Sequence, residues 1–437
     1  MGFMACLVRC VRRIFNTMDH TTEVLVSGAS IAGPALAYWL RKAGFTVTVV
    51  ERAPALRPGG QAVDLRGAGR EVITRMGLMD RVRAISVDQR GLAMVNASGR
   101  ITARMPTDSF GGEGIVSEIE ILRGDLAQVL HEATLSDVEY IFDDTITGIH
   151  QDEHGVDVTF EKAAPRRFGL VVGADGSHSV VRALAFGPES ACIRPLDVHT
   201  AWFTAHEPLE LDGWYQMHNI PGGLVASARP GRLPGEVKAG LSFRSKPIAY
   251  DRGDTAAQRA MIAERFSGAG WEVPRLLRAM HGASDFFFDS MGQVRLDHWS
   301  QGRAVLLGDA GYCPSPLTGL GTSLALVGAY VLAGELARAD GDHRTALANY
   351  DRLMRPYVDR AQELPPGGAA GYAPSSALAI RMRDLSMRSM NRWPMRALLA
   401  AQFAKAGDVD LPEYAMGARP RAGRAGGDRC TPPAGVA

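Results

Sequence analysis

Near the start of the chain, two short apolar runs lie on either side of a segment with a helical pattern. Residues 23–27 (EVLVS) form an apolar run of strand length, and residues 46–50 (TVTVV) form a β-branched one. Between them, residues 34–43 carry a helical pattern that begins at a proline, where the missing N–H would have no intrahelical partner. The three segments together predict a strand–helix–strand unit.

The pattern changes in the middle of the chain and then returns. Residues 123–134 predict a helix, and residues 170–173 and 303–307 predict buried strands. Residues 199–244 contain strand-like runs separated by Pro–Gly turns, which predicts an antiparallel sheet in a second unit. Residues 319–337 predict a long apolar helix, so the chain returns to its first unit late.

A glycine-rich loop joins the first predicted strand to the first helix. Its sequence, GASIAG, places Gly28 at a tight turn and Gly33 where the helix must pack closely on the strand. Backbone N–H groups at such a helix start can bind a pyrophosphate. Ser30 replaces the usual middle glycine, so a plain glycine-rich turn is the alternative. The predicted nucleotide contacts in this loop are Gly28, Ser30, Ile31, Ala32 and Gly33.

A carboxylate follows this loop at the end of the second predicted strand. Glu51 is placed to accept hydrogen bonds from the ribose hydroxyls of an adenosine. Arg52, beside it, could stack on the adenine or lie on the surface. These residues fit NAD and FAD equally well.

The second half of the chain distinguishes the two cofactors. The strand in residues 302–310 (GRAVLLGDA) ends in Gly-Asp, and Pro316, Gly319 and Gly321 follow before the long helix. These segments resemble the flavoprotein aromatic hydroxylases, the family of p-hydroxybenzoate hydroxylase. The resemblance implies that Asp309 binds the ribityl chain of FAD and that Gly319 and Gly321 open a helix facing the flavin. A helix N-terminus there would stabilise the negative charge of the reduced flavin.

Three other segments extend the resemblance. Asp175, in the sequence GADGS, matches a motif tied to FAD and NAD(P)H handling, partly through structure, and Arg123 matches an arginine that reaches FAD. The stretch at residues 59–65 is similar to the tetracycline-inactivating and polyketide-tailoring monooxygenases. In that branch the aspartate, here Asp64, contacts FAD. Arg57 matches an arginine linked to NADPH, although a solvated loop arginine is the alternative.

The resemblance implies an FAD-dependent monooxygenase that hydroxylates a small aromatic or polyketide-like substrate through a flavin C4a-hydroperoxide. NADPH or NADH and O2 would be the co-substrates. An FAD-dependent reductase or dehydrogenase without oxygen transfer is the main alternative. Because the flavin performs the difficult step, no catalytic residue is assigned. His199, His206 and His218 could face the substrate but are also typical of surface or core histidines.

The implied fold is α/β: a Rossmann-like βαβ FAD-binding domain with an inserted antiparallel-sheet substrate domain and a C-terminal helix. The predicted segments are a flexible extension (1–21), the FAD-binding domain (22–78, 112–185 and 285–362), the substrate domain (79–111 and 186–284), a C-terminal helical segment (363–408) and a disordered tail (409–437).

Composition narrows the remaining possibilities. The formal net charge of +1 gives no indication of nucleic acid as a partner. The five cysteines form no CxxC pair, which argues against a disulfide framework or a metal site and favours the cytoplasm. No stretch reaches the roughly 18 uncharged apolar residues of a membrane span. We therefore expect a cytoplasmic enzyme, a monomer or a homodimer, without stable membrane insertion. Residues 1–17 are expected to be dispensable, and Met18 is a possible alternative start.

Overall fold

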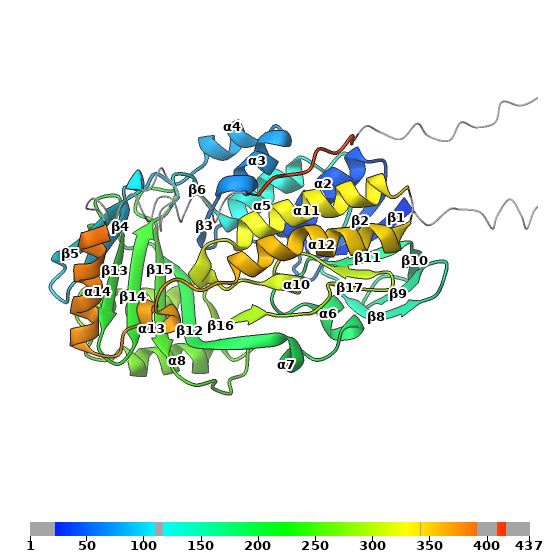
Figure 1. Cartoon of the computed structure of the whole chain (residues 1–437). Coiled ribbons are helices and arrows are strands. Elements are labelled where there is room, and N and C mark those ends of the chain that lie inside the picture. Colours follow the sequence, from blue (N-terminus) through cyan, green and yellow to red (C-terminus); the bar gives the residue numbers. More distant parts are fainter. Residues whose placement is uncertain (1–21, 110–116, 341, 391–408, 417–437) are drawn as a thin grey trace, which may run out of the picture.

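The computed structural model describes residues 22–109, 117–340, 342–390 and 409–416, which form an α/β structure around two main sheets (Figure 1). One sheet has the strand order β17-β18-β11-β1-β2-β7, and the other has the order β16-β12-β15-β14-β13-β4-β5. Figure 1 shows the six-stranded sheet and its helices at one end of the molecule and the seven-stranded sheet at the other. The predicted α/β fold class, with helices after the sheets, is confirmed.

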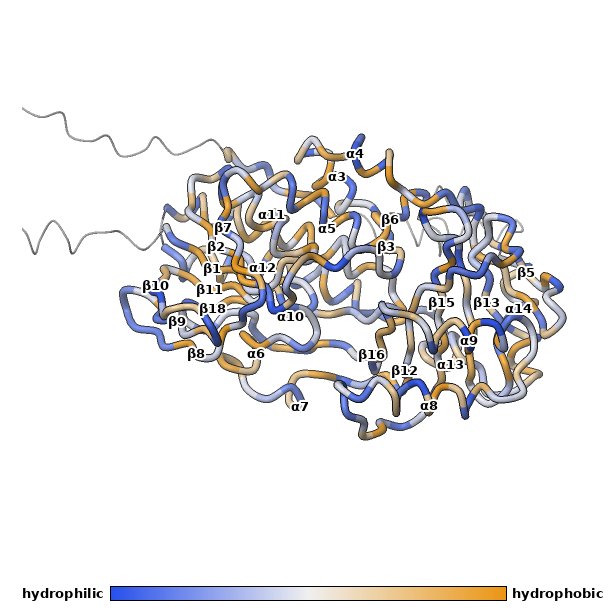
Figure 2. The backbone as a smooth tube through the Cα atoms, turned by 180° about the vertical axis from the view of Figure 1, so that it is seen from behind, coloured by the Kyte–Doolittle hydropathy of each residue, from blue (hydrophilic) through white to orange (hydrophobic). Residues whose placement is uncertain are grey.

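The six-stranded sheet is parallel apart from one edge strand. Its strands are β1 (Glu23–Ser27), β2 (Thr46–Glu51), β7 (Glu139–Phe142), β11 (Leu170–Gly173), β17 (Ser300–Gln301) and β18 (Ala304–Leu306). Only the edge strand β17 pairs in the antiparallel direction. Parallel strands are normally covered on both faces and are therefore apolar throughout. All positions of β11 and β18 are buried, and Figure 2 shows hydrophobic stretches in this part of the sheet.

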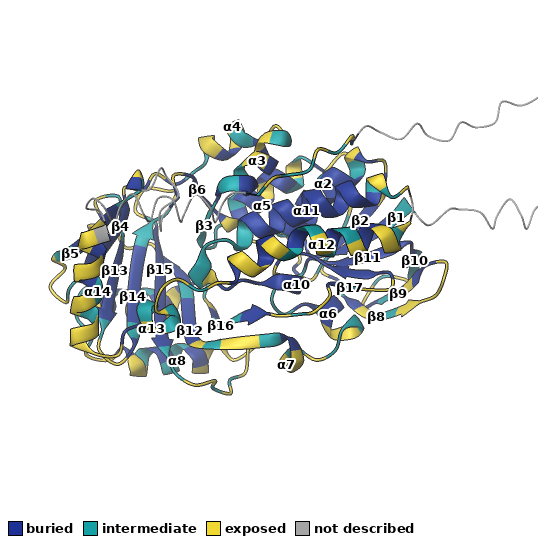
Figure 3. Ribbon diagram, in the orientation of Figure 1, coloured by how far each residue is buried: buried dark blue, intermediate teal, exposed yellow. Residues whose placement is uncertain are grey.

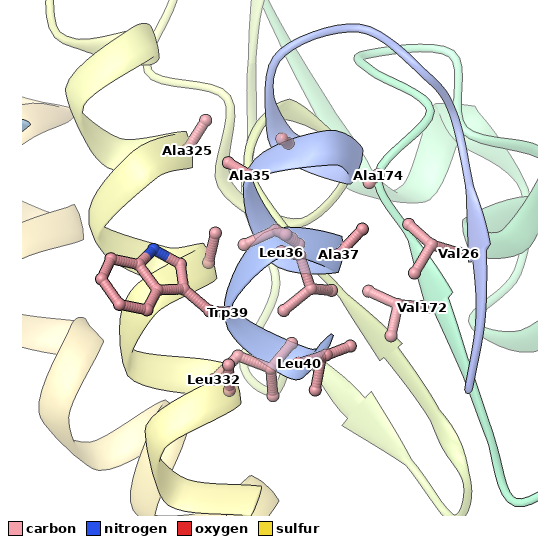
Figure 4. Close-up of a cluster of buried hydrophobic side chains, with 14 of the residues drawn as sticks. Val26, Ala35, Leu36, Ala37, Trp39, Leu40, Val172, Ala174, Ala325 and Leu332 are labelled. Atoms are coloured by element: carbon pink, nitrogen blue, oxygen red, sulfur yellow. The ribbon is translucent and has the colours of Figure 1, made fainter. Parts of the chain in front are cut away.

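A layer of three helices covers one face of this sheet. The helices are α2 (Ala32–Lys42), α11 (Gly321–Arg338) and α12 (His343–Ala361). Figure 4 shows α2 with Val26 and Val172 of the strands on one side and Ala325 and Leu332 of α11 on the other. Leu36 of α2 is completely buried in this contact. Figure 3 shows that α11 is buried along most of its length, so it is a core helix rather than a surface one.

Shorter elements complete this end of the molecule. They are α3 (Gly67–Arg75), α4 (Met79–Ala84), α5 (Arg123–Glu132), β8 (Ile146–Gln151), β9 (Val156–Phe160), β10 (Arg166–Phe168), α6 (Val180–Ala185), α7 (Glu189–Cys192), α10 (Asp309–Tyr312) and the 3-10 helix η3 (Pro316–Thr318). Strands β8 to β10 form an antiparallel three-stranded sheet. Two further strands, β3 (Ala62–Asp64) and β6 (Glu120–Leu122), form a two-stranded antiparallel sheet.

The seven-stranded sheet is mainly antiparallel. Its strands are β4 (Gly91–Val95), β5 (Ile101–Pro106), β12 (Ile193–Ala205), β13 (Trp214–Ile220), β14 (Leu224–Pro230), β15 (Val237–Arg244) and β16 (Phe287–Val294). Helices α8 (Thr255–Arg265) and α9 (Val273–Gly282) supply Ile262 and Met280 to a core that also contains Phe203 and Phe243. Helices α13 (Gly368–Tyr372) and α14 (Ala377–Met390) contact the opposite face, where Met387 and Met217 belong to one buried hydrophobic cluster.

The structure differs from the predicted segment boundaries in two places. Helix α4 falls in the predicted substrate domain, but its Val82 is buried in the core of the six-stranded sheet unit. Strand β16 falls in the predicted FAD-binding domain, but it pairs with β12 in the seven-stranded sheet. In both cases long-range packing, rather than the local pattern, decides which unit the element joins.

Residues 409–416 differ from the prediction of a disordered tail. Tyr414 donates a hydrogen bond to the buried carboxylate of Glu335 on α11 (2.7 Å), and Met416 is buried in the core. Tyr330 also donates to the carbonyl of Pro412 (2.8 Å). These hydrogen bonds attach the segment to α11. The predicted extension at 1–21, residues 391–408 and the rest of the tail lie outside the described residues.

Candidate cofactor and substrate site

Most of the predicted cofactor residues lie at one edge of the six-stranded sheet. Gly28 follows β1, Glu51 ends β2, Asp175 follows β11 and Asp309 follows β18. These four strands are parallel neighbours, so their carboxyl ends meet at the same edge. In open α/β sheets, ligands bind in the crevice outside these ends.

The loop between β1 and α2 depends on its two glycines. Gly28 has φ of 107°, and a Cβ there would lie 2.5 Å from the carbonyl oxygen of Ala174. A Cβ on Gly33 would lie 1.9 Å from the carbonyl oxygen of Gly28. Ile31 and Ala32 are buried at the start of the helix, whereas Ser30 is half-buried. The glycines therefore allow the helix N-terminus to approach the strand closely.

Glu51 is held in place by backbone donors. Its two carboxylate oxygens accept hydrogen bonds from the N–H groups of Ala29 (2.8 Å) and Ala53 (2.9 Å). A carboxylate has about four lone-pair sites, so it can accept further hydrogen bonds. Arg52 is exposed beside it.

Arg123 links two motifs that are far apart in the sequence. Its side chain donates a hydrogen bond to Ser30 (3.2 Å), and its charge also acts on Asp309. Burial raises the pKa of Asp309, while Arg123 acts in the opposite direction. Asp309 is exposed to solvent at the carboxyl end of β18.

The Gly-x-Gly segment lies close to Asp309 and Asp64. A Cβ on Gly321 would lie 3.6 Å from a carboxylate oxygen of Asp309, and one on Gly319 would lie 3.1 Å from Asp64. Pro316 begins the 3-10 helix that precedes this segment, and Gly319 caps it in a left-handed conformation with φ of 66°. The structure thus brings Asp64, Asp309 and both glycines to the N-terminus of α11.

Two of the predicted cofactor residues, Asp175 and Arg57, lie in surroundings that differ from those of Asp64 and Asp309. Asp175 accepts hydrogen bonds from Ser27 (3.2 Å), Ser179 (2.5 Å) and the N–H of Val180 (2.9 Å), which favours a structural role for its carboxylate. Arg57 is exposed, and its carbonyl rather than its side chain packs against Gly124 at the start of α5.

Asp64 belongs to a group of charged residues near the Gly-x-Gly segment whose other members were not predicted from the sequence. Asp64 forms an ion pair with Arg66 (2.9 Å), and Glu120 forms one with Arg229 (3.2 Å). Burial raises the pKa of Glu120 to about 8, although Arg229 acts in the opposite direction. Ser323 is also buried here and donates a hydrogen bond to the carbonyl of Arg66 (3.1 Å). The group comes from four distant segments, so no local pattern could reveal it.

One face of the seven-stranded sheet carries Arg229 and is the candidate substrate surface. Successive side chains of a strand point to opposite faces of the sheet. Arg229 of β14 pairs with Lys238 of β15, and Lys238 pairs in turn with Thr204 of β12, so these three side chains share one face. On this face Trp202 of β12 lies opposite Phe287 of β16, and their rings are parallel with centroids 6.2 Å apart. Trp202 is half-buried and Phe287 is exposed, so this aromatic pair is accessible.

The candidate histidines of the sheet do not share this face. His199 stacks on Phe243 in the core beneath α8 and α9, and burial lowers its pKa. His218 contacts the carbonyl of Val95 (3.0 Å) and the ring of Trp271, and burial lowers its pKa as well. Both are core histidines with polar partners.

Across the described ranges, no helix is long and apolar enough to cross a membrane, and no cluster of three or more potential metal ligands occurs.

Comparison with known proteins agrees with this geometry. The FAD binding domain family matches residues 21–363. A protein of Mycobacterium tuberculosis, described only as uncharacterized, is 46% identical over 355 residues, which are 80% of this chain and 94% of that protein. A flavin-dependent monooxygenase from an unknown prokaryotic organism is 40% identical over 397 residues, which are 91% of this chain and 100% of that protein.

Solved structures give the same result. The crystal structure of the tetracycline destructase Tet(55) matches with a TM-score of 0.75 and 35% identity, covering 91% of this chain and 100% of that one. The chain therefore belongs to the family of FAD-dependent aromatic hydroxylases, and it is an FAD-dependent monooxygenase.

Proposed function

We propose that FAD lies along the edge of the six-stranded sheet, with its adenosine end at Gly28–Gly33 and Glu51 and its ribityl chain at Asp309. The observation that carries this proposal is the contact between motifs, because Arg123 touches Ser30 and lies close to Asp309. A dinucleotide that follows these three residues reaches Gly319 and Gly321 at the start of α11. The glycine contacts leave room for a close approach, so the residues present fit the cofactor.

The remaining predicted residues have proposed roles of two kinds. Asp64 lies beside Gly319 and would border the flavin end of the site. Asp175 would shape the site through its hydrogen bonds to β1 and α6. Arg52 and Arg57 are exposed, so they would contact the outer part of FAD or the incoming NAD(P)H.

The reaction that we propose is hydroxylation of a small aromatic or polyketide-like substrate with NADPH or NADH and O2. FAD, when bound, supplies the reduction and the activation of oxygen. The chain must bind and orient the substrate and exclude water. The accessible face with Trp202 and Phe287 is suited to planar apolar rings, because aromatic side chains favour stacked arrangements. The similarity to a tetracycline destructase supports the polyketide-like class.

The test is turnover under isotope-labelled O2 with mass analysis of the product. Tetracyclines, phenols and other enolic aromatics are screened for faster NAD(P)H oxidation, and the product of each hit is analysed. We expect one labelled oxygen atom per product molecule. A substrate that is consumed without gaining label would refute oxygen transfer and favour the reductase or dehydrogenase. The cytoplasmic location and the monomer or homodimer state stay predictions.

A further inference from the structure

His178 lies in the loop after β11, three residues beyond Asp175, and both of its ring nitrogens contact carboxylates. Its Nδ1 atom lies 3.1 Å from a carboxylate oxygen of Glu189, and its Nε2 atom lies 2.9 Å from one of Asp289. The imidazole side chain is 27% exposed, and the side chain of Asp289 is 15% exposed. We call His178, Glu189 and Asp289 the His178 cluster.

These two contacts identify the charge of the imidazole. An ionised carboxylate has no proton to donate, so each ring nitrogen must donate to its carboxylate. A neutral imidazole has one N–H group and can donate to only one of the two. Carboxyl groups lose their proton at about pH 4 and imidazoles at about pH 6.5, so the additional proton belongs on the imidazole. His178 is therefore an imidazolium between two carboxylates.

Other polar side chains hold the carboxylates in place. Arg252 donates to the second oxygen of Glu189 (2.7 Å), and Tyr250 donates to the second oxygen of Asp289 (3.1 Å). The charged and titratable groups that face the cluster thus come from α7, from β16 and from the segment between β15 and α8. Burial lowers the pKa of His178, but the hydrogen bonds with Asp289 and Glu189 raise it by more, so it lies above its usual value of 6.5.

The loop of residues 175–179 is also attached to the proposed cofactor site. Arg182 of α6 donates hydrogen bonds to the carbonyl groups of Ser177 (2.5 Å) and Ala310 (2.9 Å). Ala310 follows Asp309, which is the residue proposed to bind the ribityl chain. A change in the position of this loop would therefore reach the cofactor site through Arg182.

His178 connects the same loop to the seven-stranded sheet. Asp289 lies on β16, and Glu189 begins α7, which leads directly into β12. Figure 1 shows β12 extending from α7 to the rest of this sheet. If His178 loses its proton, one of the two hydrogen bonds is lost and the other no longer involves a cation. Hydrogen bonds between ionised groups are the stronger ones, so the loop would then be held less tightly.

We propose that His178 is a positioning residue for the cofactor site, which as an imidazolium holds the loop of residues 175–179 in the conformation that binds FAD. This proposal rests on the proposed function, because it needs FAD to lie beside Asp309. The FAD affinity should therefore depend on pH. The contribution of the imidazolium is complete below pH 6.5, and it is lost as the pH rises through the raised pKa of His178.

The test is the dissociation of FAD from the holoenzyme on dilution, measured by the fluorescence of released flavin between pH about 6 and about 9. We expect the Kd of the wild-type protein to rise by about five- to twentyfold across this range, a usual size for a coupling between two sites. His178→Gln keeps a hydrogen-bonding side chain that cannot ionise. Its Kd should equal the high-pH value of the wild type throughout the range.

Two further variants separate the charge of the cluster from general effects of mutation. His154→Gln removes an exposed histidine from the turn between β8 and β9 and should keep the pH dependence of the wild type. Asp289→Asn keeps the size of the side chain but removes its charge, so the fall in FAD affinity should begin at a lower pH. If His178→Gln and His154→Gln show the same pH dependence, the proposal is wrong.

The protonation of His178 is measured separately from FAD binding. In NMR spectra of the holoenzyme with isotope-labelled histidine, the signal that is missing from His178→Gln should titrate above pH 6.5. A signal that titrates at or below this pH would contradict the imidazolium. A failure of the FAD site itself is recognised at a single pH, from unchanged FAD affinity in Arg123→Ala and Asp309→Asn, and leaves the titration of His178 as it is.

Discussion

Replacing Glu120 by glutamine should change how the stability of the protein depends on pH. Glutamine has nearly the same shape and can still donate a hydrogen bond to Asp64, but it cannot ionise. In the wild-type protein the pKa of Glu120 is raised from 4.5 to about 8, because burial and Asp64 raise it by more than Arg229 and Arg66 lower it. The variant therefore removes one titration and little else.

The sign and size of the effect follow from proton linkage. Between pH 4.5 and about 8 the folded protein holds a proton on Glu120 that the unfolded chain has lost. The contribution to the free energy of unfolding is thus fully present below pH 4.5 and is lost as the pH rises towards 8. One proton corresponds to about 1.4 kcal/mol per pH unit, so two units inside this window cost roughly 2–3 kcal/mol.

The measurement is urea unfolding of the holoenzyme at saturating FAD, repeated across this pH range. We expect the difference in stability between Glu120→Gln and wild type to move in favour of the variant as the pH rises. Glu118→Gln is the matched control, because the Glu118 side chain is 70% exposed and its ion pair with Arg70 is long at 3.5 Å. If wild type and Glu120→Gln show the same pH slope, the reasoning is refuted.

Three further predictions test the cofactor site and the packing. Arg123→Ala and Asp309→Asn should each weaken FAD binding by about ten- to hundredfold, measured by the fluorescence of released flavin, and unchanged affinity in both would exclude the proposed site. Leu36→Ala should lower the free energy of unfolding by about 2–5 kcal/mol, whereas Leu135→Ala, at a site 55% exposed, should change it by less than about 0.5 kcal/mol. If urea titrations show that Leu36→Ala and Leu135→Ala lower the free energy of unfolding equally, the packing of Leu36 in Figure 4 is contradicted. Tyr414→Phe should lower the free energy of unfolding by about 1.5–3 kcal/mol, because it removes a hydrogen bond to the buried carboxylate of Glu335 on α11. If the variant is as stable as the wild type, this hydrogen bond contributes nothing.

Some elements were predictable because their signal is local. The strands at 23–27 and 170–173 have the predicted bounds, since a short apolar run next to turn residues is a strand signal by itself. The helix predicted at 34–43 begins two residues earlier, at Ala32, because the chain turns into the helix directly after the glycine loop. Glycine at positions 28 and 33 fixed the shape of that loop through local sterics.

Other elements depended on contacts that a sequence pattern does not contain. Strand β16 was predicted in the wrong unit because its partner, β12, is separated from it by about eighty residues. Residues 409–416 carry no helix or strand pattern, yet Tyr414 donates a hydrogen bond to a buried acceptor on α11. In each case a contact with a segment far away in the sequence decided where the residues lie.

The sequence by itself determined the family-like order of motifs, the strand–helix–strand start and the residue types of the cofactor site, because these depend on near neighbours along the chain. The tertiary structure alone decided that Arg123 meets Ser30, that Gly319 meets Asp64 and that the carboxyl groups of Asp64 and Glu120 oppose each other. The physical reason is that ionisation depends on burial and on nearby charges, and both arise only when distant strands pair. A glutamate in the sequence reads as an anion, whereas the folded protein makes Glu120 a proton-holding acid beside two arginines.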